Sequence, residues 1–139
     1  MNMERDFEAG ESKEYQEDKM RRPVRMLEIY DSIKLHLKDL QSAMNESSSR
    51  VAVTTTKRLK ELCNREDMDD NTFIMAAAPI FLMFDIKLMT RILKDGRPAI
   101  QFRLIKDNER AYLPESYQSR ADKLKEYIDY RERVKALGE

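Results

Sequence analysis

The chain has 139 residues, which is enough for one ordinary domain with a hydrophobic core. Charged residues make up 37% of it, the 26 Lys and Arg balance the 26 Asp and Glu, and there are only three glycines and one cysteine. This composition excludes collagen-like, disulfide-scaffold and histone-like proteins, and it favours a helix-rich fold.

The sequence predicts an intracellular protein, cytoplasmic or nuclear, that is not embedded in a membrane. A single cysteine, Cys63, cannot form an intramolecular disulfide, and residues 1–18 lack the basic, apolar and small-residue order of a secretory signal. The most apolar run, residues 73–84, has twelve residues. Spanning a bilayer takes about 20 residues, so we interpret this run as part of the core.

Residues 1–20 form an acidic segment with little to bury. Seven acidic residues stand against three basic ones, so the net charge of the segment is −4. A segment with high charge and few apolar residues cannot offset the entropy lost on folding. We therefore expect a disordered acidic tail, followed by a single helix-rich domain over residues 21–139.

Residues 24–44 carry the clearest periodic signal. Apolar side chains recur there at alternating intervals of four and three residues, which is the spacing of a heptad seam. The seam consists of Met26, Tyr30, Ile33, Leu37, Leu40 and Met44. It predicts a helix that binds a protein partner or a second copy of the chain. The alternative is an ordinary amphipathic helix that packs within its own domain.

Two further helices are expected in the middle of the chain. Residues 50–65 predict a basic helix, although three consecutive threonines, Thr54 to Thr56, weaken its start. After the acidic connector 66–70, residues 72–94 predict a buried helix that contains Pro79. Because an interior proline removes a hydrogen bond, Pro79 should either kink this helix or separate two helices.

The C-terminal third predicts a hairpin and a last helix. In residues 99–105 apolar and polar residues alternate, and after a polar turn residues 111–113 provide a partner strand, which gives a hairpin over 99–113. Residues 119–137 predict the C-terminal helix. The fold class is therefore mainly α within α+β, with four to five helices and one short hairpin.

Counting residues leaves little catalytic chemistry. His36 and Cys63 are unique, so zinc sites built from several Cys and His cannot form. Asp67, Asp69 and Asn71 begin like a calcium-binding loop, but the sixth position lacks glycine and the twelfth lacks glutamate. We expect no enzymatic activity, no catalytic residues, no metal, no cofactor and no small-molecule substrate.

Charge is more informative than any motif. Residues 50–65 and 86–110 each carry a net charge of +4. In the second segment the order of helix, Asp95-Gly96 and hairpin resembles that of a winged helix-turn-helix, where a helix enters the major groove and the hairpin contacts phosphate. The candidate nucleic-acid contacts are Lys57, Arg58, Lys60, Arg91, Lys94, Arg97 and Arg103.

Two functions remain open at this point. The first is a small non-enzymatic adaptor or accessory protein that assembles through the seam, with itself or with a protein partner. The second is a nucleic-acid-binding regulator of transcription or replication with a winged-helix-like arrangement. A pI near 6.6 weighs against the second, because nucleic-acid-binding domains often have a pI above about 9. A solvated, salt-bridged surface would also account for the basic segments.

Overall fold

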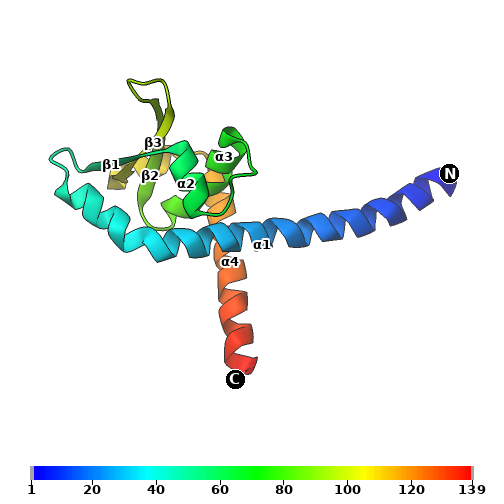
Figure 1. The fold of residues 1–139 in the computed structure, drawn as a ribbon. Coiled ribbons are helices and arrows are strands. Elements are labelled where there is room, and N and C mark those ends of the chain that lie inside the picture. Colours follow the sequence, from blue (N-terminus) through cyan, green and yellow to red (C-terminus); the bar gives the residue numbers. More distant parts are fainter. Residues whose placement is uncertain (1, 139) are drawn as a thin grey trace.

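The computed structural model describes the backbone of residues 2–138 and the side chains of residues 24–138. Four α-helices, one 3-10 helix and a three-stranded antiparallel sheet make up this part of the chain, which confirms the predicted α+β class (Figure 1). In chain order they are α1 (Asn2–Glu46), β1 (Val51–Thr55), α2 (Thr56–Leu62), α3 (Asp70–Leu82), β2 (Ile86–Ile92), β3 (Pro98–Leu104), η1 (Asp107–Tyr112) and α4 (Glu115–Gly138).

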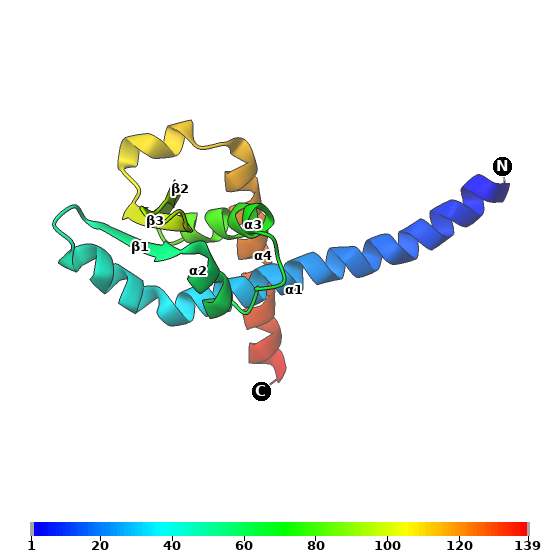
Figure 2. The ribbon, with the colours of Figure 1, turned by 45° about the horizontal axis from the view of Figure 1, so that its top comes forward.

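Strand β3 lies in the centre of the sheet, in the order β1-β3-β2. The register places Ala52 and Leu88 on either side of Phe102, so these three side chains share one face. Helix α1 packs against β1 and α3, α3 packs against β2, and α4 packs against α1 and α3. In both ribbon views α4 crosses α1 and continues beyond it to the C-terminus (Figures 1 and 2).

The core lies between the inner face of the sheet, α1 and α3. Phe81 of α3 and Phe102 of β3 are each 1% exposed, and their ring centroids are 5.1 Å apart. Ile33 of α1 and Leu124 of α4 belong to the same buried cluster. Burial of these apolar side chains is the main favourable contribution to folding.

The prediction of a basic helix over 50–65 was wrong for its first residues. Residues 51–55 form β1, and the helix begins only at Thr56. The two valines and two threonines of β1 are β-branched, which favours extended backbone, and Thr55 then caps α2 by accepting a hydrogen bond from the Arg58 amide at 3.1 Å. The helix ends before Asn64, which has a φ of 54°.

The expected buried helix over 72–94 was correct only in its first half. Helix α3 begins after Asp69, whose carboxylate accepts from the Thr72 amide at 3.1 Å. It ends at Leu82, and residues 86–92 form β2. The chain changes direction at Asp85, which has a φ of 62°, so the helix cannot continue through it.

Pro79 lies inside α3 and does not divide it. A proline at this position leaves the carbonyl of residue 75 without its helical donor. The guanidinium of Arg120 on α4 donates to the Met75 carbonyl at 3.2 Å and supplies a replacement. The contact also joins α4 to α3.

The prediction of a hairpin over 99–113 was correct for its first strand, which is β3, and wrong for the partner strand expected at residues 111–113. Strand β3 pairs with β2 and β1, while residues 107–112 form the 3-10 helix η1. The tight turn lies between β2 and β3, where the Gly96 amide donates to the Leu93 carbonyl at 2.9 Å. Gly96 has a φ of 87°, a conformation that favours glycine.

The helices expected at 24–44 and 119–137 are confirmed within α1 and α4, although α4 begins earlier, after Pro114. The backbone of α1 extends to Asn2. Side chains before residue 24 lie outside the described part, so the disorder of the acidic tail over 1–20 stays a prediction, as does the single domain over 21–139.

Candidate nucleic-acid interface

All six seam residues of α1 face the interior of their own chain. Tyr30, Ile33 and Met44 are buried members of the core cluster. Met26, Leu37 and Leu40 are half-buried and pack against the same cluster. The apolar side of α1 therefore already has a partner within the chain. Assembly through this seam stays a prediction.

The register of the sheet brings two basic segments to one end. Ala99 of β3 pairs with Thr55 of β1 on one side and with Arg91 of β2 on the other. Thr55 is the cap of α2, and Arg91 comes just before the β2–β3 turn. The first turn of α2 and the β2–β3 turn therefore lie at the same end of the sheet, which we call the basic end.

Five of the seven candidate contacts belong to the basic end and are exposed: Lys57, Arg58, Arg91, Lys94 and Arg97. The β2–β3 turn projects from the sheet on the side away from α1 (Figure 1). Within the turn Arg97 is paired with Asp95 at 2.6 Å, and on β2 Arg91 donates to the Gln101 side chain of β3 at 3.3 Å. The Arg97 side chain remains 64% exposed, so it can still reach a phosphate.

The other two candidates are engaged elsewhere. Lys60 bonds to Asp70 at 3.0 Å, and its side chain is only 13% exposed. Arg103 lies toward the opposite end of β3, where it is held by Glu109. These contacts join neighbouring elements, so we assign both residues to the fold and not to the interface.

Glu109 of η1 accepts hydrogen bonds from Arg103, Lys87 and Lys106, a role that the sequence did not indicate. Both of its carboxylate oxygens accept from the Arg103 guanidinium at 2.6 Å, and one also accepts from Lys87 at 3.2 Å. The Lys106 amide donates at 3.0 Å. The hydrogen bonds from Arg103, followed by those from Lys106 and Lys87, hold the pKa of Glu109 well below its usual range.

Stability should therefore depend on pH through Glu109. Because its pKa is lower in the folded than in the unfolded state, its contribution is complete above the unfolded value of about 4.3 and is lost as the pH falls further. We expect Glu109→Gln to lower the melting temperature at pH 7 and the difference from wild type to shrink below about pH 4. Thermal unfolding between pH 7 and 2.5 measures this. A difference that is constant across that range would contradict it.

Helix α3 has few exposed side chains that could contact the edges of nucleic-acid bases. It contains no basic residue, and an acidic run from Glu66 to Asp70 precedes it. Residues Ala77 to Leu82 are buried, and only Asn71, Thr72 and Met75 are exposed on the helix. The basic end can therefore contact phosphates, while α3 has few side chains to read bases.

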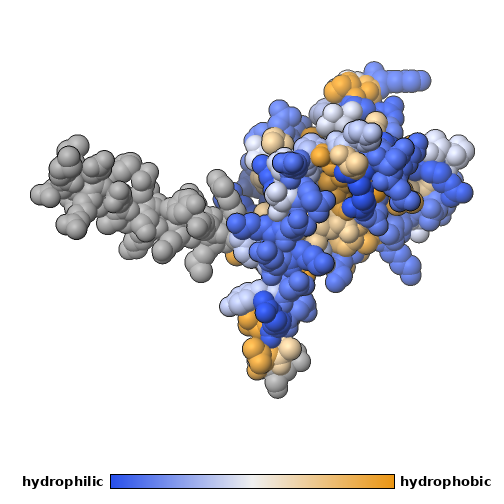
Figure 3. Space-filling model, turned by 180° about the vertical axis from the view of Figure 1, so that it is seen from behind, coloured by the Kyte–Doolittle hydropathy of each residue, from blue (hydrophilic) through white to orange (hydrophobic). Residues whose placement is uncertain are grey.

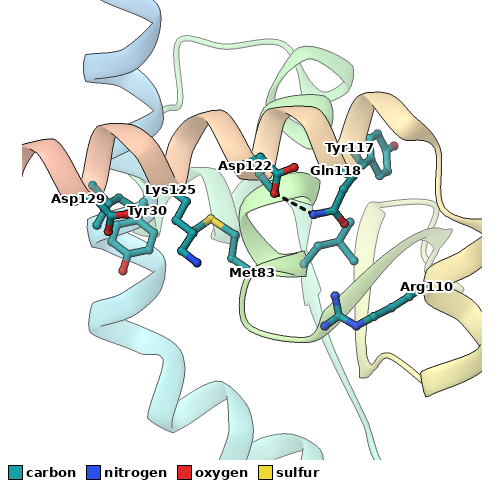
Figure 4. Close-up of a pocket in the computed structure, with 11 residues that line it drawn as sticks. Tyr30, Met83, Arg110, Tyr117, Gln118, Asp122, Lys125 and Asp129 are labelled. Carbon is teal, nitrogen blue, oxygen red and sulfur yellow. Dashed lines mark hydrogen bonds between the residues drawn. The ribbon is translucent and has the colours of Figure 1, made fainter.

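A polar cleft of about 440 Å³ lies between α1, the end of α3, and α4 (Figure 4). Its charges balance, since Arg110 and Lys125 stand against Asp122 and Asp129. Asp122 accepts a hydrogen bond from Gln118 at 3.0 Å, while Arg110 is paired with Asp85. The cleft therefore has no excess positive charge for a polyanion.

The unique histidine and cysteine, His36 and Cys63, line one groove between α1 and α2. Burial raises the pKa of the Cys63 thiol to about 11. The thiol is therefore protonated at neutral pH, and a protonated thiol is a poor nucleophile and metal ligand. Among the residues that the structure describes, no group of three His, Cys, Asp or Glu side chains could hold a metal ion.

Polar residues cover most of the face seen in Figure 3, and apolar ones show near its top, in its middle and at the free end of α4. There Val134 is 48% and Leu137 is 87% exposed. No helix in the described part of the chain is long and apolar enough to cross a bilayer.

Comparison with known proteins identifies no family for this chain. The chain matches no protein-family model, and searches of curated proteins and of solved structures found no match either.

Proposed function

We propose that this chain is a nucleic-acid-binding protein that holds the phosphate backbone with its basic end. The observation that carries the proposal is the pairing of Ala99 with both Thr55 and Arg91, which unites the start of α2 with the β2–β3 turn. Five exposed cations on α2, β2 and the β2–β3 turn can contact phosphates several nucleotides apart. Such contacts supply most of the affinity in non-specific binding.

The arrangement of the elements supports the same function. Helices α2 and α3 are followed by two strands and a projecting turn, an order that resembles a winged helix-turn-helix, although the sequence placed the wing in the hairpin expected over 99–113. In that arrangement the β2–β3 turn takes the place of the wing. Because α3 is acidic at its start and otherwise apolar, we expect contacts to phosphate to dominate over contacts to bases.

Titration of a labelled random duplex and a labelled single strand at 50 and 200 mM salt tests the proposal. Four to five phosphate contacts predict a slope of log affinity against log salt of about −4, which is roughly a 250-fold loss between the two conditions. Reversing three charges at the basic end, Lys57→Glu, Arg91→Glu and Lys94→Glu, should weaken binding to every sequence and flatten the slope by about 2.7.

The matched control carries the same change in net charge elsewhere. Lys38→Glu on α1 with Lys123→Glu and Lys135→Glu on α4 alters exposed lysines outside the basic end. We expect this variant to retain most of the wild-type affinity and slope. Equal losses in the two variants, or no binding by the wild type at 50 mM salt, would refute the proposal.

A second candidate is the adaptor function, for which the exposed end of α4 is the specific observation. Tyr130, Val134 and Leu137 are spaced by four and three residues and are 63%, 48% and 87% exposed. Val134 and Leu137 follow Arg131, which pairs with Asp31 of α1, so they lie on the part of α4 that continues past α1 (Figure 1). The seam of α1, through which the sequence predicts assembly, is tested separately by Ile33→Glu.

A further inference from the structure

The groove between α1 and the β1–α2 segment is a cavity of about 450 Å³ with an apolar floor. Phe81, Phe102 and Leu59 lie beneath it, and Leu40 and Leu62 contribute to its walls. Small-molecule sites in proteins occupy about 300–1,000 Å³ and combine such apolar linings with a few polar groups. In size and lining the groove fits a compact ligand.

Two opposite charges line the two walls of the groove. Asp39 belongs to the α1 wall, and Arg58 belongs to the α2 wall. Among the side chains that the structure describes, Asp39 has no hydrogen bond or ion pair, and the only ionic neighbour of Arg58 is Glu61 at 3.8 Å. No ion pair joins Asp39 to Arg58, so both have capacity for a ligand.

We propose that this groove binds a free amino acid with a large apolar side chain. The ligand's ammonium would meet Asp39, its carboxylate would meet Arg58, and its side chain would lie over the apolar floor. A simple anion would be repelled by Asp39 and a simple cation by Arg58, whereas a zwitterion satisfies both groups. Charge-assisted hydrogen bonds to the two charged groups, with burial of the ligand's side chain over the apolar floor, favour leucine, methionine or phenylalanine over glycine.

Arg58 belongs to both the groove and the basic end. A bound carboxylate would occupy the guanidinium that otherwise contacts phosphate, so the amino acid should weaken nucleic-acid binding. This coupling rests on the proposed function, whereas binding of the amino acid itself does not. The groove would then act as a regulatory site for the basic end.

Isothermal titration with L-leucine, L-methionine and L-phenylalanine tests the groove, with glycine and N-acetyl-leucine amide as matched probes. The three apolar amino acids should bind at least tenfold more tightly than glycine, which lacks the apolar part, or the amide, which lacks both charges. Asp39→Asn and Arg58→Gln should each weaken leucine binding at least tenfold. Asp129→Asn on α4 is the control and should leave leucine binding unchanged.

Absence of heat with all three amino acids at 10 mM, or equal binding of leucine and glycine, would overturn the inference. Leucine binding by a protein that does not bind nucleic acid would support the groove and contradict only the proposed function. If both ligands bind, leucine should weaken nucleic-acid binding by the wild type and not by Arg58→Gln. Simultaneous binding without competition in the wild type would overturn the regulatory coupling.

Discussion

Replacing Phe81 by alanine is expected to reduce the free energy of unfolding by about 3–5 kcal/mol, because the change removes a large buried side chain and leaves a cavity. Phe81 is 1% exposed and packs on Phe102 with ring centroids 5.1 Å apart. Since a whole domain is stable by about 5–15 kcal/mol, this single change should greatly increase the unfolded population.

Urea denaturation monitored by circular dichroism measures the effect, with Met75→Ala as control. Met75 lies on the same helix and is 51% exposed, so truncating it removes little buried surface. We expect the control to stay within about 0.5 kcal/mol of wild type. A Phe81→Ala variant as stable as the control would mean that the packing of α3 on the sheet is not as described.

Replacing Ile33 by glutamate is expected to cost about 3–5 kcal/mol, because the charge would be buried without a partner. Ile33 is 3% exposed and belongs to the seam of α1 and to the core cluster. If the seam packs within one chain, the variant should melt at a lower temperature while the mass of its folded fraction stays that of the wild type. Sedimentation equilibrium and thermal unfolding measure the two quantities.

Leu35→Glu provides the control on the same helix. Leu35 is 78% exposed, so a charge there remains solvated and the melting temperature should barely change. If Ile33→Glu instead converts an oligomer into a folded monomer with the same melting temperature, the seam is an assembly surface and the adaptor function gains support.

The helices at 24–44 and 119–137 could be predicted because helix formation depends on residues three and four apart along the chain. The same spacing identified the apolar side of α1. It could not identify what that side contacts, because a seam has the same pattern whether its partner is another chain or the rest of its own domain.

Strand β2 could not be predicted in the same way. Ile86, Met89, Ile92 and Leu93 fit a helical period, and the preceding residues are helical, so local pattern favoured a longer helix. Residues 86–92 are extended because they pair with β3: the register sets Ile86 opposite Leu104 and Ile92 opposite Pro98. The same pairing gave β3 its true hairpin partner.

The candidate interface shows the same limit. Seven basic residues stand out in the sequence by their charge, but charge alone does not reveal which of them are held in ion pairs within the fold. Glu109, six residues after Arg103, holds the guanidinium in two hydrogen bonds, while Asp70 holds Lys60. Asp31 and Arg131, which join α1 to α4, are separated by 100 residues.

The sequence by itself determined the α+β class, the existence of the long helices, their apolar sides and the two basic segments, since these follow from composition and from spacing over a few residues. Only the tertiary structure decided that the seam of α1 faces the core, that residues 51–55 and 86–92 form strands, and that five basic residues meet at one end of the sheet. Those outcomes depend on pairing between segments far apart in the chain, and local periodicity carries no information about that pairing.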